Sequence, residues 1–152
     1  MTGAVEPWSP DTPGVLVLPS GRLVRGRGLR HPLPGGSLPT YALYLLGREP
    51  DPQPWPSTWL RWPDFRLPAD RDEAAAAIRG TLARLTEDRV EVACGGGRGR
   101  TGTAVACLVA LDTGTTEGAV DWVRAHYDRR AVETPAQRRY VARFLDGGAG
   151  LS

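Results

Sequence analysis

The sequence predicts an α/β domain with a central, mostly parallel sheet flanked by helices and a β-hairpin at its N-terminal end. Two observations support this fold class. Apolar segments of strand length come first and then alternate with segments of helical composition, and the 152 residues, with 41% hydrophobic and 24% charged side chains, suit one compact globular domain. We expect this domain to span residues 14–148, after a flexible, proline-rich arm at residues 1–13.

Five segments have the length and apolar content of β-strands: residues 14–18, 22–25, 41–46, 58–61 and 90–93. The first two are separated by Pro19-Ser20-Gly21, which predicts a tight turn and therefore the hairpin. The third, with the sequence YALYLL, is so apolar that we expect it to be buried. Glycine and proline are frequent in residues 26–39 and 47–56, which are expected to be loops.

Four segments are expected to be helical: residues 70–85, 101–111, 116–127 and 134 to about 147–148. Glu73 follows Asp70 by three residues, and Gln137 follows Thr134 by the same interval, so both pairs predict a capping box at a helix start. Pro135 suits the first helical position, because its ring holds φ near the helical value.

The charge balance argues against a protein devoted to binding nucleic acid. Nineteen basic residues, all arginine, oppose 17 acidic residues, for a formal net charge of +2. Two cysteines and two histidines form no closely spaced ligand pair, so no metal and no other cofactor is expected. The chain starts without a basic and then apolar leader, and its longest apolar run, residues 104–111, is too short for stable membrane insertion. We therefore expect a cytoplasmic protein.

A glycine-rich segment lies between the last predicted strand and a predicted helix: Cys94, Gly95, Gly96, Gly97, Arg98, Gly99 and Arg100. Glycine lets the backbone fold closely around a small anion. The backbone N–H groups of such a loop, and the N-terminus of the helix that follows, favour phosphate. An arginine side chain can hold two phosphate oxygens at once. Residues 95–100 are therefore predicted to bind phosphate.

The same positive surroundings favour the thiolate form of Cys94. Thr101 follows the loop directly and can hydrogen-bond the sulfur. The predicted chemistry is attack of this thiolate on a phosphate ester, through a covalent phosphocysteine. The alternative is a flexible connector in which Cys94 is a small buried hydrophobic residue. The position between a buried strand and a helix, with Arg100 at the end of the loop, favours the catalytic interpretation.

A second motif, Trp62-Pro63-Asp64, places a carboxyl group between aromatic residues just after a predicted strand. An acid on such a loop can protonate the oxygen that leaves the phosphorus. Taken alone, this tripeptide would be an ordinary turn.

Together the two motifs resemble the cysteine-based protein tyrosine phosphatase superfamily, including its dual-specificity branch. Members of that superfamily carry the pattern H-C-x5-R-[ST] and an upstream Trp-Pro-Asp acid loop. The resemblance covers roughly residues 40–145, with 30 residues between Asp64 and Cys94. It implies Cys94 as the nucleophile, Arg100 as the phosphate clamp, Thr101 as the group that stabilises the departing thiolate, and Asp64 as the acid and then the base.

The chain departs from the superfamily pattern at two places. Ala93 stands where a histidine usually precedes the nucleophile, and that histidine orders the loop in the family. The Q-T-x-x-Q segment that positions the hydrolytic water in tyrosine-specific enzymes is here Glu133-Thr134-Pro135-Ala136-Gln137. Gln137 is thus a candidate both for positioning water and for capping its helix, and the two roles are compatible.

The resemblance implies a phosphorylated protein as the partner, with phosphotyrosine as the leading substrate or a dual specificity. A basic residue at the position of Arg98 binds extra phosphates in lipid-directed members, which makes phosphoinositides or inositol phosphates the alternative. A non-catalytic, phosphate-binding pseudophosphatase is the alternative of another class. A sulfurtransferase or arsenate reductase would not need Asp64. The sequence leaves the oligomeric state and the depth of the pocket open.

Overall fold

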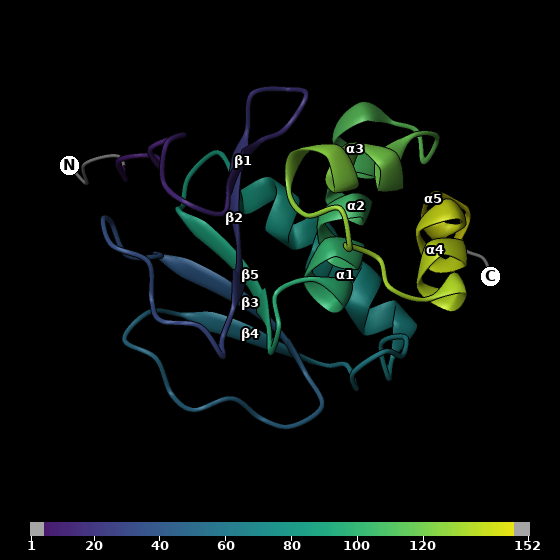
Figure 1. Cartoon of the computed structure of the whole chain (residues 1–152), viewed down its shortest axis with the longest axis horizontal. Helices are drawn as coiled ribbons and strands as arrows, with labels where there is room; N and C mark the ends of the chain where they lie inside the picture. Colours follow the sequence, from purple (N-terminus) through teal and green to yellow (C-terminus); the bar gives the residue numbers. More distant parts are fainter. Residues whose placement is uncertain (1–4, 148–152) are drawn as a thin grey trace.

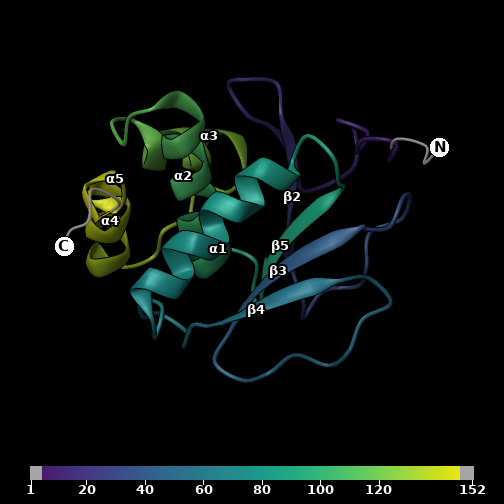
Figure 2. The same cartoon turned by 180° about the vertical axis from the view of Figure 1, so that it is seen from behind.

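A computed structural model describes residues 5–147 as one five-stranded sheet with its helices gathered on one side (Figures 1 and 2). The strands are β1 (Val15–Val17), β2 (Leu23–Gly28), β3 (Tyr41–Leu46), β4 (Ser57–Arg61) and β5 (Val90–Cys94). The helices are α1 (Arg71–Arg84), α2 (Gly99–Thr113), α3 (Ala119–His126), α4 (Pro135–Ala142) and α5 (Phe144–Gly147).

The strand order β1-β2-β5-β3-β4 places β5 at the centre of the sheet. β2, β5, β3 and β4 run parallel, and β1 pairs antiparallel with β2 through the predicted hairpin. The expected fold class is therefore confirmed. Because parallel strands end at the same edge of a sheet, the carboxyl ends of β2, β5 and β3 gather there. The register places Gly28 opposite Cys94 at this edge.

The two faces of the sheet are covered differently. Val90, Val92 and Cys94 of β5 belong to a large core that also holds buried residues of every helix. The side chains between them point the other way, and Ala93 joins a smaller cluster with Ala42, Tyr44 and Trp55. Trp55 belongs to the proline-rich segment 47–56, which crosses this second face as a loop. We call the second face the helix-free face.

α2 lies at the centre of the helical layer and contacts α1, α3 and α4. It ends at Gly114, whose φ of 84° is left-handed and therefore favours glycine. The predicted helix starts are confirmed at both caps. Asp70 accepts a hydrogen bond from the Glu73 N–H at 3.0 Å, and Thr134 forms the complete capping box of α4 with the residue three positions on.

Four predicted boundaries are wrong. β2 extends to Gly28, into the segment expected to be a loop, because β5 supplies a parallel partner that local composition cannot show. α2 begins at Gly99 rather than near Thr101, since the loop already closes a helical turn. The third helix begins later, at Ala119. The last predicted helix is divided, because Arg143, with φ −106° and ψ 5°, separates α4 from α5.

Trp8 anchors residues 5–13 to the sheet. Its side chain is 2% exposed, its Nε1 donates to the Val90 carbonyl at 3.1 Å, and its ring lies 4.3 Å from the Arg25 guanidinium. This part of the predicted flexible arm is therefore docked. Residues 1–4 of the arm, and Gly148 at the predicted end of the last helix and of the domain, lie outside the described residues.

Candidate active site

β5 delivers Cys94 to the carboxyl edge of the sheet, where a cavity of about 250 Å³ opens above the sulfur. Its lining comes from four separate parts of the chain: the segment after β2, residues 62–66 after β4, the glycine loop and the segment before α4. We call residues 62–66, which include the predicted acid Asp64, the acid segment. The lining residues are Arg30, His31, Asp64, Phe65, Cys94, Gly96, Arg98, Gly99, Arg100 and Glu133. This volume can hold a phosphate group and part of its substituent.

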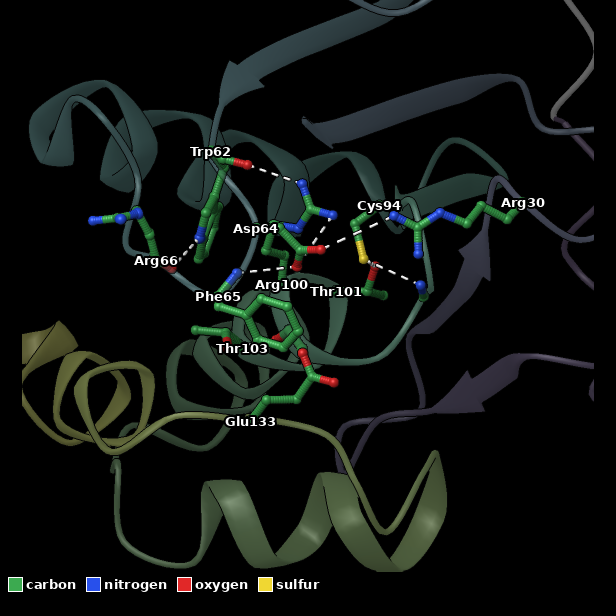
Figure 3. Close-up of polar contacts among 12 residues, drawn as sticks. Arg30, Trp62, Asp64, Phe65, Arg66, Cys94, Arg100, Thr101, Thr103 and Glu133 are labelled. Atoms are coloured by element: carbon green, nitrogen blue, oxygen red, sulfur yellow. Dashed lines mark hydrogen bonds and ion pairs between the residues drawn. The ribbon is translucent and has the colours of Figure 1, made fainter. Parts of the chain in front are cut away.

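The sulfur of Cys94 lies inside the curve of the glycine loop and accepts two hydrogen bonds (Figure 3). The Gly97 N–H donates to Sγ at 3.2 Å, and the Thr101 hydroxyl donates to it at 3.0 Å. The N–H and the hydroxyl both direct a polar hydrogen at the sulfur. The predicted pair of Cys94 and Thr101 is thus brought into contact.

The curve of the loop depends on glycine at position 97. Its φ of 77° is left-handed, and a Cβ added there would lie 2.5 Å from the Gly28 backbone nitrogen. Two backbone hydrogen bonds tie the loop to the chain after β2, from Leu29 N to the Cys94 carbonyl at 2.8 Å and from Arg30 N to the Gly95 carbonyl at 3.0 Å. These bonds bring Arg30 alongside the loop.

Tyr127 braces the loop from the far side. Its hydroxyl, at the C-terminal end of α3, donates to the Gly97 carbonyl. Burial, and next the charge of Cys94, raise the pKa of Tyr127 well above the ordinary value of a tyrosine, so it remains a hydrogen-bond donor. Tyr127 therefore holds the Gly97 carbonyl from α3.

Arg100 is buried, with 5% of its side chain exposed, and it links the glycine loop to the acid segment. NH1 donates to the Trp62 carbonyl at 3.0 Å, and NH2 lies 3.5 Å from Oδ1 of Asp64. Nε is buried and has no hydrogen-bond partner among residues 5–147. A buried cationic group with an unused donor favours an anion beside it, because an unpaired donor in a protein interior is costly.

Asp64 stands at the wall of the cavity with 42% of its side chain exposed. Besides Arg100, it faces Arg30, whose NH2 lies 4.0 Å from Oδ2, and it accepts the Phe65 N–H at 3.0 Å (Figure 3). Phe65 has a left-handed φ of 61° and is 59% exposed, so its ring stands at the mouth of the cavity. The carboxyl group thus lines the same cavity as the Cys94 sulfur and is open to solvent.

The acid segment is held by Trp62 and Gln137. The Trp62 ring is fully buried and its Nε1 donates to the Arg66 carbonyl at 2.7 Å, which closes the turn. Gln137 Nε2 donates to the same carbonyl at 3.2 Å. Its Oε1 accepts from the N–H groups of Glu133 and Thr134, at 2.9 and 3.3 Å. The structure therefore places Gln137 behind the acid segment, capping α4, and not in the lining of the cavity.

Four lining residues were outside the sequence-based set: Arg30, His31, Phe65 and Glu133. Arg30 has the same residue type as its neighbours on the hairpin, and local sequence could not separate it from a solvated arginine. Glu133 lies against the loop, with its carboxylate filling the space where a side chain at Gly99 would stand. Phe65 could have been predicted as a lining residue from one sequence feature, its position directly after Asp64.

Arg98, predicted to bind phosphate, lies at the rim and forms an ion pair with Asp128 at 3.3 Å. Within residues 5–147 no three His, Cys, Asp or Glu side chains come together in a group that could hold a metal ion. The helices of that same part of the chain include none long and apolar enough to cross a membrane.

Comparisons with known proteins place this chain in a family and a fold. Residues 54–143 match the family described as PTP-SAK, a Swiss Army Knife protein, DSP-PTPase phosphatase domain. Two uncharacterised proteins of Methanocaldococcus jannaschii are each 32% identical, over 59% and 62% of this chain. The matched regions span 55% and 63% of those curated relatives, so the chain covers somewhat more than half of their length.

Solved structures share the fold. The active form of Tk-PTP superposes with a TM-score of 0.61 at 22% identity, covering 70% of this chain and 78% of that one. A substituted kinase-associated phosphatase gives 0.56 at 24% identity, over 64% of this chain and 56% of that chain. PTPMT1 in complex with PI(5)P gives 0.54 at 14% identity, over 72% and 80%.

Proposed function

The chain belongs to the PTP-SAK family of DSP-PTPase phosphatase domains, and on that premise we propose that it hydrolyses phosphate monoesters through a phosphocysteine at Cys94. One observation carries the proposal. The sulfur of Cys94 accepts two hydrogen bonds at the floor of a cavity whose walls hold the buried guanidinium of Arg100 and the carboxyl group of Asp64. Nucleophile, clamp and acid therefore face one small volume.

In the first step, the phosphate ester binds to the loop N–H groups and to Arg100, whose unused Nε supplies one donor. The Cys94 thiolate attacks phosphorus, so an S–P bond forms as the P–O bond to the leaving group breaks. Asp64 gives its proton to that leaving oxygen. The products are the phosphocysteine and a neutral alcohol or phenol.

In the second step, a water molecule attacks the phosphocysteine, and the Asp64 carboxylate takes its proton. The S–P bond breaks and inorganic phosphate is released. The departing thiolate is stabilised by the Thr101 hydroxyl and the Gly97 N–H, which already contact the sulfur. Asp64 thus ends the cycle protonated, ready for the next ester. We assign Gln137 the role of positioning the acid segment, because its amide groups are engaged by backbone.

Two substrate classes follow from the family resemblance. Phosphotyrosine, with or without dual specificity, is supported by the exposed Phe65 ring at the mouth, which can pack on an aryl group. Phosphoinositides or inositol phosphates are supported by Arg30, a second guanidinium beside the cavity. We place the activity in a reducing compartment such as the cytoplasm, because attack requires a reduced thiol, and we assign it to residues 14–148.

The test is hydrolysis of para-nitrophenyl phosphate in the presence of EDTA. We expect turnover that survives chelation, because the thiolate and the guanidinium supply the nucleophile and the charge stabilisation. Cys94→Ser and added vanadate should both abolish it. A wild-type protein that binds vanadate but releases no phosphate from any ester would instead be a phosphate-binding pseudophosphatase.

A further inference from the structure

A second cavity, of about 820 Å³, adjoins the Cys94 cavity on the helix-free face of the sheet. The two cavities share Arg30, Asp64 and Arg100 in their walls. The outer wall of the second one is the proline-rich segment 47–56, including Trp55. Its volume lies in the range of roughly 300–1,000 Å³ that is typical of small-molecule sites. No step of the proposed hydrolysis uses this space.

The sheet beneath this cavity carries a buried cluster of three charged side chains. Arg25 NH2 lies 2.6 Å from Oε1 of Glu91, and Arg27 Nε lies 2.8 Å from the same oxygen. The side chains of Arg25 and Glu91 are fully buried, and that of Arg27 is 9% exposed. Within residues 5–147, Glu91 is the one carboxylate that forms an ion pair with either arginine. The cluster therefore holds one uncompensated positive charge in a medium of low dielectric.

Arg27 is the member of the cluster that lines the cavity, and Arg25 does not. Nε and NH2 of Arg27 bind Glu91, at 2.8 and 3.1 Å. Tyr44 lies beside it in the wall, and its oxygen accepts the Trp55 Nε1–H at 2.8 Å. Burial raises the pKa of Tyr44 above its ordinary value, so its own proton stays available for donation.

The remaining charges place an anion at the floor of the cavity and not at its rim. On the exposed outer segment, Arg48 is outnumbered by Glu49 and Asp51. Asp64 is already engaged by Arg100 and Arg30. The side chain of Arg30 is 69% exposed at the junction of the two cavities. Positive charge thus runs from the glycine loop past the junction to Arg27.

We propose that the second cavity binds a second phosphate group of the substrate, with Arg27 and Tyr44 as its binding groups. The proposal rests on the phosphatase activity proposed above and names its substrate class, a small phosphate monoester that carries another phosphate. The phosphate to be cleaved occupies the Cys94 cavity, the body of the substrate passes Arg30, and the second phosphate reaches Arg27. A phosphotyrosyl side chain has no group to fill that place.

The test compares kcat/KM for matched pairs of substrates that differ by one phosphate. The pairs are fructose 6-phosphate with fructose 1,6-bisphosphate, inositol 1-phosphate with inositol 1,4-bisphosphate, and adenosine 5′-phosphate with adenosine 3′,5′-bisphosphate. We expect the bisphosphate of at least one pair to be preferred by about 10- to 100-fold, the effect of one charge-assisted contact. The pair that shows the preference identifies a sugar, a lipid headgroup or a nucleotide as the source. No preference in any pair overturns the proposal.

Arg27→Gln should reduce this preference about 10- to 100-fold. Arg25→Gln is the matched control, because it removes the same charge from the same Glu91 without touching the cavity. It should change the preference by less than about twofold. Equal losses in both variants would assign the effect to the buried cluster and overturn the site. If Arg27→Gln does not fold, Tyr44→Phe removes one hydroxyl and should still lower the preference by about 3- to 10-fold.

Failure of the second site and failure of the phosphatase proposal give different results. Wild-type protein that hydrolyses para-nitrophenyl phosphate without any bisphosphate preference removes the second site and keeps the activity. Protein that hydrolyses no ester removes the activity. In that case, calorimetry measures binding of the same substrate pairs to Cys94→Ser. Tighter binding of the bisphosphate that depends on Arg27 would support the second site. Equal binding of both members of each pair would overturn the second site as well as the activity.

Discussion

Thr101 is one of two donors to the Cys94 sulfur, and it can be changed without altering the backbone. Thr101→Ala should lower kcat by about 10- to 100-fold, because one hydrogen bond to a charged sulfur is lost. The loss should fall mainly on breakdown of the phosphocysteine, where the thiolate leaves. Rapid-quench measurement should therefore show the phosphoenzyme accumulating.

Thr103→Ala is the control for this substitution, because the Thr103 hydroxyl donates to the Gly99 carbonyl within α2 and not to sulfur. It should retain most of the activity. Equal effects of the two substitutions would mean that Thr101 acts through the helix and not on the thiolate.

Asp64 lines the same cavity as Cys94, and its side chain has the exposure that proton transfer to a leaving group requires. Asp64→Ala should lower kcat/KM by roughly 10²- to 10⁴-fold for alkyl phosphates. The loss should shrink for aryl esters with acidic phenols, whose oxygen departs without a proton. A series of substituted phenyl phosphates measures this slope, and a loss independent of the phenol would exclude Asp64 as the acid.

Tyr127 contacts the loop and not the substrate, so its role is to position the Gly97 segment. Tyr127→Phe should weaken vanadate inhibition and lower kcat/KM by about 10-fold, since the Gly97 carbonyl loses its donor. The pKa of Tyr127 is raised, so its neutral form persists through the assay range. The variant and the wild type should therefore have pH profiles of the same shape.

Tyr140→Phe provides the matched control for Tyr127→Phe, because Tyr140 packs edge-on against Trp62 and its hydroxyl has no hydrogen-bond partner among residues 5–147. A Tyr140 variant as impaired as the Tyr127 variant would contradict the positioning role.

At the scale of elements, α4 and the acid segment are joined through Gln137. Gln137→Ala should lower the free energy of unfolding by about 2 to 3 kcal/mol, because three backbone groups lose a partner. In the Gln137→Ala background, Asp64→Ala should also cost less kcat/KM than it does in the wild type. The reason is that the acid segment loses its contact at Arg66. Urea denaturation and a double-mutant cycle with Asp64→Ala measure the two effects.

Thr134→Ala separates capping from positioning, because it removes the cap of α4 and leaves the Gln137 contact to Arg66 in place. It should cost about 1 kcal/mol of stability and leave the acid step unchanged. If Thr134→Ala also reduced the contribution of Asp64 to kcat/KM, any weakening of α4 would disturb the acid, and Gln137 would have no specific positioning role.

At the scale of the whole molecule, the chain before the first strand takes part in the fold through Trp8. Trp8→Ala should lower the free energy of unfolding by about 3 to 5 kcal/mol, as for other large buried side chains. Trp59→Ala is the comparison, because that ring is 36% exposed at the edge of the sheet. A Trp8 variant as stable as the wild type would show that residues 5–13 are a free arm after all.

Helix caps and buried strands could be predicted well because their signals are local. Asp70, Thr134 and Gly114 each cap a helix end through contacts with residues a few positions away. The apolar sequence YALYLL predicts a buried strand whichever strands it pairs with. The extension of β2 and the docking of Trp8 could not be predicted in this way. Both depend on β5, which lies more than 60 residues away in sequence from either partner.

The sequence alone determined three residues of the candidate site, Cys94, Arg100 and Thr101. They lie within eight consecutive residues, and glycine and a helix start set the local conformation of that segment. Tertiary structure decided what surrounds these three residues. Arg30, Tyr127, Gln137 and the second cavity meet the loop only after the parallel sheet has formed. Contacts made across such a sheet join distant segments, and neither spacing nor residue type along one chain records which of them become neighbours.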